Sequence, residues 1–163
     1  MSLPTPLARL FAPTRRTFRG PIATRAERAA VTDALAARLG IVSTDYDRAL
    51  CTARLDRVGL YLAPAVALAG GYLTSYADLF DASGKTVDPH SRHSGVPAIA
   101  TFPIHLAGET IGHVTLGALL GSEPLVGVEI DGEPLPPVPL LDDSALFESA
   151  VRLGERVRAV ASR

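Results

Sequence analysis

The sequence has a single cysteine and no tryptophan among its 163 residues. One cysteine cannot form a disulfide within the chain, and this absence favours a reducing compartment, which we take to be the cytoplasm. Cys51 follows Ala49 and Leu50 in an apolar run with no base nearby, which is typical of a small buried residue and not of a nucleophile. A chain of this length can bury a core without a disulfide or a metal ion to hold it together.

Long hydrophobic runs are also missing. The longest weakly polar run, residues 58–73, contains Pro64, Gly70 and Gly71 and is shorter than the ~20 apolar residues that span a bilayer. Residues 1–6 lack the basic-then-apolar order of a secretion signal. We therefore expect no membrane partner.

Charge of neither sign dominates, because the formal net charge is −1, and we expect no nucleic acid partner. Basic residues are nevertheless concentrated near the start, where Glu27 is the only acidic residue among six arginines: Arg9, Arg15, Arg16, Arg19, Arg25 and Arg28. Prolines interrupt residues 1–22, which predicts an extended arm that is either solvated or in contact with a phosphate or a protein partner. The predicted organisation is this arm followed by one domain over residues 23–163.

Helix signals lie near both ends of the predicted domain. Thr24 and Glu27 have the spacing of a capping box, and Gly40 supplies a stop. An apolar stripe lies between them: Ala30, Val31, Ala34, Leu35 and Leu39. A shorter helix is predicted from Ser43 or Thr44. The last helix is predicted to begin near Asp142, Asp143 or Ser144, with a seam that packs on the sheet or pairs with another helix: Leu146, Ala150, Leu153, Val157 and Val160.

Strand signals fill the middle of the chain. Residues 58–62, 72–80 and 125–130 are short apolar runs that predict strands, whereas residues 63–71 fit either a helix or an edge strand. Residues 81–84 and 131–132 have turn chemistry. Residues 88–97 are predicted to form a polar loop, and the proline-rich residues 134–139 an extended connector.

The clearest signal is a hairpin of residues 99–106 and 110–117 around the loop Ala107-Gly108-Glu109. Its register predicts one apolar face, formed by Ala100, Phe102, Ile104, Leu106, Gly112, Val114 and Leu116. The other face is mixed and contains Thr101, Pro103, His105, Ile111, His113 and Thr115. A sheet with one face packed on the core has this pattern.

Together these signals predict the α+β class, with a central antiparallel sheet of about five to six strands and the N- and C-terminal helices packed on one face. Three segments resemble a GAF domain, a small ligand-sensing domain related in shape to PAS domains. They are residues 57–62, similar to that family's first sheet strand, the hairpin of residues 98–117, and the closing helix of residues 142–163. The resemblance implies helices on one face of the sheet, a ligand pocket or lid on the other, and a role in sensing or dimeric regulation.

The resemblance does not bring a ligand with it. Cys51 stands alone and lies in the early helical region, so neither the cysteines of the methionine-sulfoxide-reducing branch nor a bilin-attachment cysteine is present. The cyclic-nucleotide signature of the phosphodiesterase branch is also missing. The cofactor is therefore unknown, and we predict no metal.

The histidines are the main titratable groups of interest. His105 and His113 share the mixed face of the hairpin, and His90 and His93 lie in the polar loop with Asp88. Imidazole ligands suit a transition metal, but the spacing of these histidines is loose and no Cys or Glu residue completes a metal-binding pattern with them. Pocket-lining histidines on the sheet remain an alternative to exposed ones. The predicted ligand-binding set is His105, His113, Thr101, Thr115, His90, Arg92, His93, Tyr72 and Tyr76.

Catalysis has less support in the sequence. No Gly-x-Ser-x-Gly or phosphate-loop motif is present, and Asp142-Asp143 suits a helix cap better than an acid–base pair. The leading hypothesis is a GAF-like sensory or regulatory domain that binds a small molecule or a protein partner and forms a homo-oligomer through its terminal helices. The alternatives are a small enzyme with His105 or His113 as general base, and a pure interaction module that uses the arginine arm.

Overall fold

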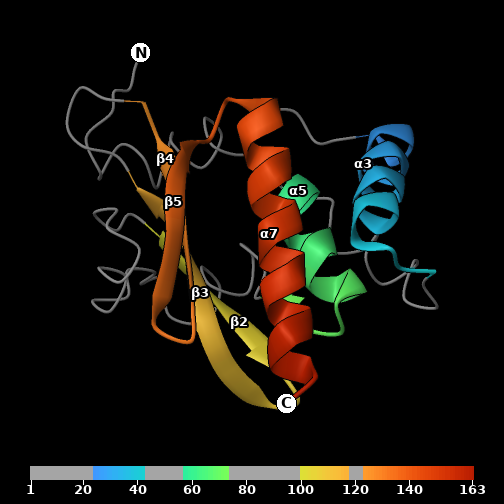
Figure 1. Cartoon of the computed structure of the whole chain (residues 1–163). Coiled ribbons are helices and arrows are strands. Elements are labelled where there is room, and N and C mark those ends of the chain that lie inside the picture. The colour runs from blue at the N-terminus through green and yellow to red at the C-terminus, as the bar shows by residue number, and fades with distance from the viewer. Residues whose placement is uncertain (1–23, 43–56, 74–99, 118–122) are drawn as a thin grey trace.

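The helices and the sheet form layers that hold one face of the sheet against the core (Figure 1). The computed structural model describes residues 24–42, 57–73, 100–117 and 123–163. The elements within these ranges are α3 (Arg25–Leu39), α5 (Arg57–Leu68), β1 (Tyr72–Leu73), β2 (Ala100–Leu106), β3 (Glu109–Gly117), β4 (Leu125–Ile130), β5 (Glu133–Pro139) and α7 (Asp143–Ala161). The five strands form one antiparallel sheet in the order β1-β2-β3-β4-β5. The predicted α+β class, with terminal helices on one side of the sheet, is confirmed.

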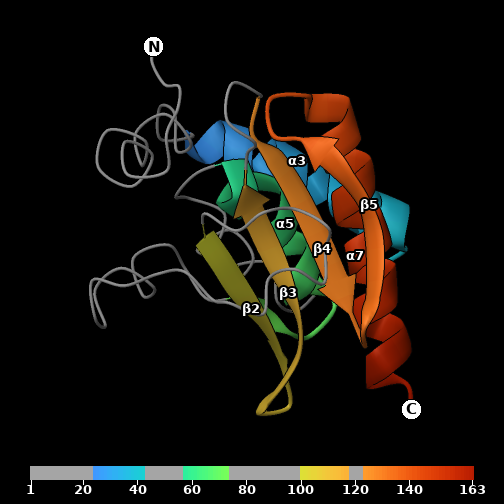
Figure 2. The same cartoon turned by 90° about the vertical axis from the view of Figure 1, so that its left-hand side faces the viewer.

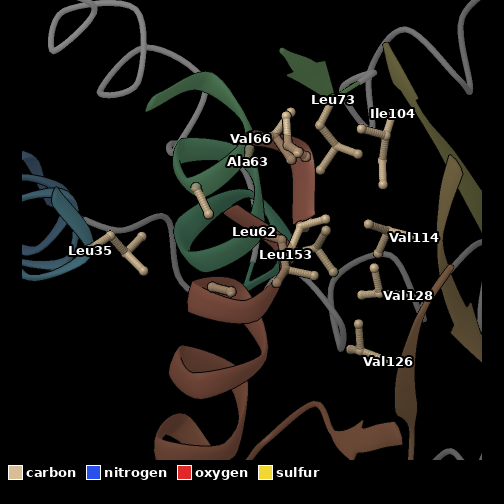
Figure 3. Packing of buried hydrophobic residues seen from close by; sticks show 14 of the residues in the cluster. Leu35, Leu62, Ala63, Val66, Leu73, Ile104, Val114, Val126, Val128 and Leu153 are labelled. Atoms are coloured by element: carbon tan, nitrogen blue, oxygen red, sulfur yellow. The ribbon is translucent and has the colours of Figure 1, made fainter. Parts of the chain in front are cut away.

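The helices themselves form two layers. Helices α5 and α7 lie next to the sheet, and α3 packs on these two helices from outside (Figures 1 and 2). Leu62 of α5 and Leu153 of α7 point toward Val114 and Val128 of the sheet (Figure 3). One apolar core therefore joins all the layers, and it includes Leu35 from α3.

Helix α3 begins and ends where the sequence predicts. The Thr24 hydroxyl accepts a hydrogen bond from the backbone N–H of Glu27 at 3.1 Å, and the Glu27 carboxylate accepts one from the N–H of Thr24 at 2.8 Å. Gly40 ends the helix with φ of 68°, a left-handed conformation that suits glycine. The buried stripe is rotated from the predicted one, because Ala30 and Ala34 are exposed while Thr32, Leu35, Ala36 and Leu39 are buried.

Residues 58–62 are helical, so the strand predicted there is wrong. They form the first half of α5, which contacts α3, α7 and β1. Nine of its twelve residues are buried, so no polar side marks the helical period and the apolar run reads like a buried strand. Residues 63–71, which fit either element, continue the helix to Leu68. This segment therefore does not supply the first strand that the GAF resemblance implies.

The hairpin of β2 and β3 has the predicted faces. Phe102 pairs with Val114 and Ile104 with Gly112 on the core side, while Thr101 pairs with Thr115 on the other. The connection has two residues and not three, Ala107 and Gly108, both with positive φ. The register shifts between Ile104 and His105, which marks a bulge near the turn.

The proline-rich residues 134–139 are not a connector outside the sheet. They belong to β5, which pairs with β4 beyond the turn at Asp131 and Gly132. Proline donates no hydrogen bond to a ladder, and an edge strand tolerates this loss. The prolines of β5 are Pro134, Pro136, Pro137 and Pro139.

The predicted apolar seam of helix α7 packs against other elements of the same chain. Asp142 caps it by accepting a hydrogen bond from the N–H of Ala145 at 3.0 Å. Helix α7 packs on α5, α3 and the sheet, and four residues of the seam are buried: Leu146, Ala150, Leu153 and Val157. The seam is therefore not available to a second copy of the chain.

Several predictions lie outside the described residues. These are the arm over residues 1–22, the helix from Ser43 or Thr44, the strand beyond Leu73, the turn at residues 81–84 and the loop at residues 88–97.

Candidate ligand site on the sheet face opposite the helices

The candidate site follows from the strand register. Residues that pair directly across neighbouring strands project from the same face of a sheet. Pairing places Pro103, His113 and Glu129 in one row across β2, β3 and β4. The next row contains Thr101, Thr115 and Gly127. These two rows form the polar face, on the side of the sheet away from α5 and α7.

The His113–Glu129 contact lies at the centre of this face. Nδ1 of His113 lies 3.4 Å from Oε1 of Glu129, and the two side chains are 20% and 7% exposed. The other carboxylate oxygen, Oε2, accepts a hydrogen bond of 2.5 Å from the backbone N–H of Gly132. The β4–β5 turn therefore holds the carboxylate in place, and the carboxylate in turn orients the imidazole ring.

Thr101 and Thr115 carry the most unusual polar atoms of the face. Both residues are 1% exposed, and they lie opposite each other on β2 and β3. Neither hydroxyl has a hydrogen-bond partner among the residues that the structure describes. A buried hydroxyl without a partner costs about 1–3 kcal/mol, so a pair of them is an uncommon feature of a folded protein.

Aromatic rings lie at the β1 edge of the same face. The rings of Tyr72 and His105 are stacked, with centroids 6.0 Å apart and an angle of 23° between their planes. The Thr110 hydroxyl lies 3.4 Å from Nδ1 of His105. This pair gives the face a flat border beside the polar rows.

The electrostatics of the face are dominated by one carboxylate. The described strands contain no lysine or arginine, whereas the described helices and the two residues after α7 carry eight arginines: Arg25, Arg28, Arg38, Arg57, Arg152, Arg156, Arg158 and Arg163. Glu129 is therefore the formal charge nearest to the two threonines in the strand register. A negative group with buried hydroxyls beside it disfavours anions and favours hydrogen-bond donors.

Five of the nine residues in the predicted ligand-binding set lie on this face: His105, His113, Thr101, Thr115 and Tyr72. The other four lie outside the described residues: His90, Arg92, His93 and Tyr76.

Glu129 is the site residue that the sequence did not reveal. It faces His113 across β3 and β4, a contact that was not anticipated from the sequence. One signal was present, since Glu129 alternates with the apolar residues Val126 and Val128 and so had to project away from the core. Its partner depends on the register between two strands, which the sequence leaves open.

Other kinds of site find no support in the described part of the chain. No group of three or more His, Cys, Asp or Glu side chains lies close enough to hold a metal ion among those residues. Among the described helices, none combines the length and the apolar character needed to cross a bilayer.

The chain was compared with family models, curated proteins and solved structures. No family model, curated protein or solved structure matches it. The case for a function therefore depends on the geometry of the polar face.

Proposed function

We propose that this chain is a small-molecule-binding sensory or regulatory domain of the GAF type, with its ligand on the polar face of the sheet. The observation that carries the proposal is the pair of buried hydroxyls of Thr101 and Thr115 beside the His113–Glu129 contact. A ligand that bonds both hydroxyls would offset the desolvation cost of two buried groups that lack a partner among the described residues.

The arrangement of the sheet supports the same proposal. Helices α5 and α7 cover one face of the sheet and form the core together with it. The polar residues of the opposite face are not part of this core. Binding sites usually combine an apolar scaffold with a few convergent polar groups, and the two rows across β2, β3 and β4 have this character. We place the protein in the cytoplasm because its single cysteine is compatible with a reducing compartment.

We also propose that the domain forms a homo-oligomer through its terminal helices, although not through the seam of α7. The outer surfaces of α3 and α7 are left for such a contact. Between these helices lies a hollow of about 390 Å³ that is lined by Val31, Tyr61 and Phe147. Sedimentation should show a dimer, and Phe147→Glu should shift it to the monomer because a buried charge is costly at an interface. A monomer at all concentrations for the unmodified chain would remove this part.

The ligand proposal is tested by NMR of threonine methyl groups during a screen with a chemically diverse fragment library. We expect some fragments to shift the methyl signals of Thr101 and Thr115. Thr24, which caps α3 on the opposite side of the core, is the internal control. A library in which no compound moves the two sheet threonines more than Thr24 would contradict the proposal.

A second candidate is a small enzyme with His113 as general base, which the contact with Glu129 favours. A carboxylate that orients an imidazole is a recurring arrangement in acid–base catalysis. Hydrolysis of an activated ester would test it, because His113→Gln should then lower the rate about 100-fold. The control Arg25→Gln, at the exposed start of α3, should leave the rate unchanged. A rate for the unmodified protein no higher than that of free imidazole would exclude this chemistry.

A further inference from the structure

The polar groups of the candidate site specify more than the presence of a ligand. Thr101 and Thr115 lie directly opposite each other, which places their Cβ atoms about 5 Å apart on neighbouring strands. Each hydroxyl donates one hydrogen bond and accepts others. Two such groups can bind one chemical group that presents an acceptor next to a donor.

Charge narrows the choice of ligand. The Glu129 carboxylate is in the row adjacent to the threonines and is only 7% exposed. Water screens a buried charge poorly, so an anionic ligand group would be repelled at this position. The described strands offer no lysine or arginine to offset this repulsion.

We propose that the site binds an uncharged carboxamide-type group, in which a carbonyl acceptor adjoins an N–H donor. The carbonyl oxygen accepts from one threonine hydroxyl, and the N–H donates to the other. Primary amides, cyclic amides and the amide-like edges of nucleobases share this chemistry. The inference rests on the proposed function and adds the chemical class of the ligand.

A matched pair of probes tests the class directly. Benzamide and benzoate have nearly the same shape, but benzoate has lost the donor and carries a negative charge. We expect benzamide to bind at least about ten-fold more tightly in titrations followed at the Thr101 and Thr115 methyl groups, since it avoids the repulsion and keeps both hydrogen bonds. Acetamide and acetate repeat the comparison without the ring, so that an aromatic group too large for the site does not decide the result.

Variants at the threonines separate hydrogen bonding from packing. Thr115→Val replaces the hydroxyl with a methyl group, and it should weaken benzamide binding about ten-fold. Thr115→Ser keeps the hydroxyl and should retain binding. The melting temperature of the ligand-free Val variant should not fall, because the hydroxyl that it removes has no partner in the described part of the chain. If the Val variant does not fold, the Ser variant and the probe pair on the unmodified chain decide the question.

Glu129→Gln tests the charge argument. The amide oxygen of glutamine still accepts the hydrogen bond from Gly132, but the negative charge is gone. We expect benzoate to gain affinity and the preference for benzamide to shrink about ten-fold. An unchanged preference would mean that Glu129 does not set the selectivity, and it would overturn the charge argument.

The outcomes distinguish the ligand class from the proposed function. Benzoate that binds the same threonines as well as benzamide does would overturn the carboxamide class and leave a ligand site in place. The same conclusion holds if library fragments of other chemistry shift these threonines while both amides fail. If neither the probes nor any fragment shifts them, the class and the proposed function fall together.

Discussion

Gly112 shows how one residue can determine the geometry of the polar face. It lies on β3 opposite Ile130, next to the pair formed by His113 and Glu129. A Cβ atom at this position would lie 3.0 Å from Cα of Ile130 and well inside contact distance of the carbonyl oxygen of Glu129. Backbone atoms cannot rotate away as a side-chain end can, so the close approach of β3 and β4 depends on this glycine.

We therefore expect Gly112→Ala to force the two strands apart and to destabilise the protein by about 1–3 kcal/mol. Urea denaturation followed by circular dichroism would measure the change. Thr110→Ala, at the exposed start of the same strand, is the matched control and should have a much smaller effect. Equal losses for the two variants would show that the glycine has no special role.

Ala107 presents the opposite case, because a side chain occupies a position that suits glycine or asparagine. Its φ is 51°, and Gly108 follows with φ of 83°, which is the conformation of a type I′ turn. Ala107→Asn should stabilise the hairpin by about 0.5–1 kcal/mol, since asparagine tolerates the left-handed region better than alanine does. Thermal unfolding would detect the gain, and Ala107→Val should move the melting temperature the other way. A decrease for the asparagine variant would refute this account of the turn.

At the scale of single elements, local signals were sufficient wherever the chain alternates or carries a cap. The Thr24 capping box and the β2–β3 hairpin each depend on residues a few positions apart, and both were predicted. Helix α5 was mistaken for a strand because its surroundings are apolar on nearly every side, which erases the helical period. Glu129 was missed for a related reason, because its partner is set by strand pairing and not by sequence spacing.

The contact between α3 and α7 makes part of the stability depend on pH. Nη1 and Nη2 of Arg38 donate to the two carboxylate oxygens of Glu148 at 2.7 and 2.9 Å. This hydrogen bonding from Arg38 holds the pKa of Glu148 below its ordinary value of 4.5. A carboxyl group with a lowered pKa in the folded state contributes stability above that ordinary value and loses it as the pH falls through the folded-state pKa.

The melting temperature of the protein should accordingly fall as the pH drops below about 4.5, and Glu148→Gln should flatten part of this decline. The effect should be small and should shrink with added salt, because both side chains are about half exposed. Glu109→Gln, at the exposed start of β3, serves as the control. Parallel profiles for the unmodified chain and Glu148→Gln would show that the pair does not link stability to pH.

At the scale of the whole molecule, a single core unites helices and sheet. Leu35 of α3, Leu62 of α5, Leu153 of α7 and Val114 of β3 belong to the same buried cluster. No layer has a core of its own, because each covers the apolar side of the next (Figure 1). Loss of one layer would expose the apolar surface of its neighbour, and this favours unfolding in one step.

We expect thermal unfolding to follow one transition in far-ultraviolet circular dichroism and in tyrosine fluorescence. The first method reports mainly on the helices. The second includes Tyr61 on α5 and Tyr72 on β1, without interference from tryptophan. Midpoints that agree would support one cooperative unit, whereas an earlier loss of helix would mean that the layers unfold separately.

The prolines of β5 have a consequence for how the protein behaves at high concentration. An unpaired sheet edge invites a strand of another molecule to add to it, and this is a common route to fibrils. Four of the seven residues of β5 cannot donate a backbone hydrogen bond, so an incoming strand would find an incomplete ladder there. This border of the sheet therefore resists templated growth, and a partner that approaches along β5 has to be held mainly by side-chain contacts.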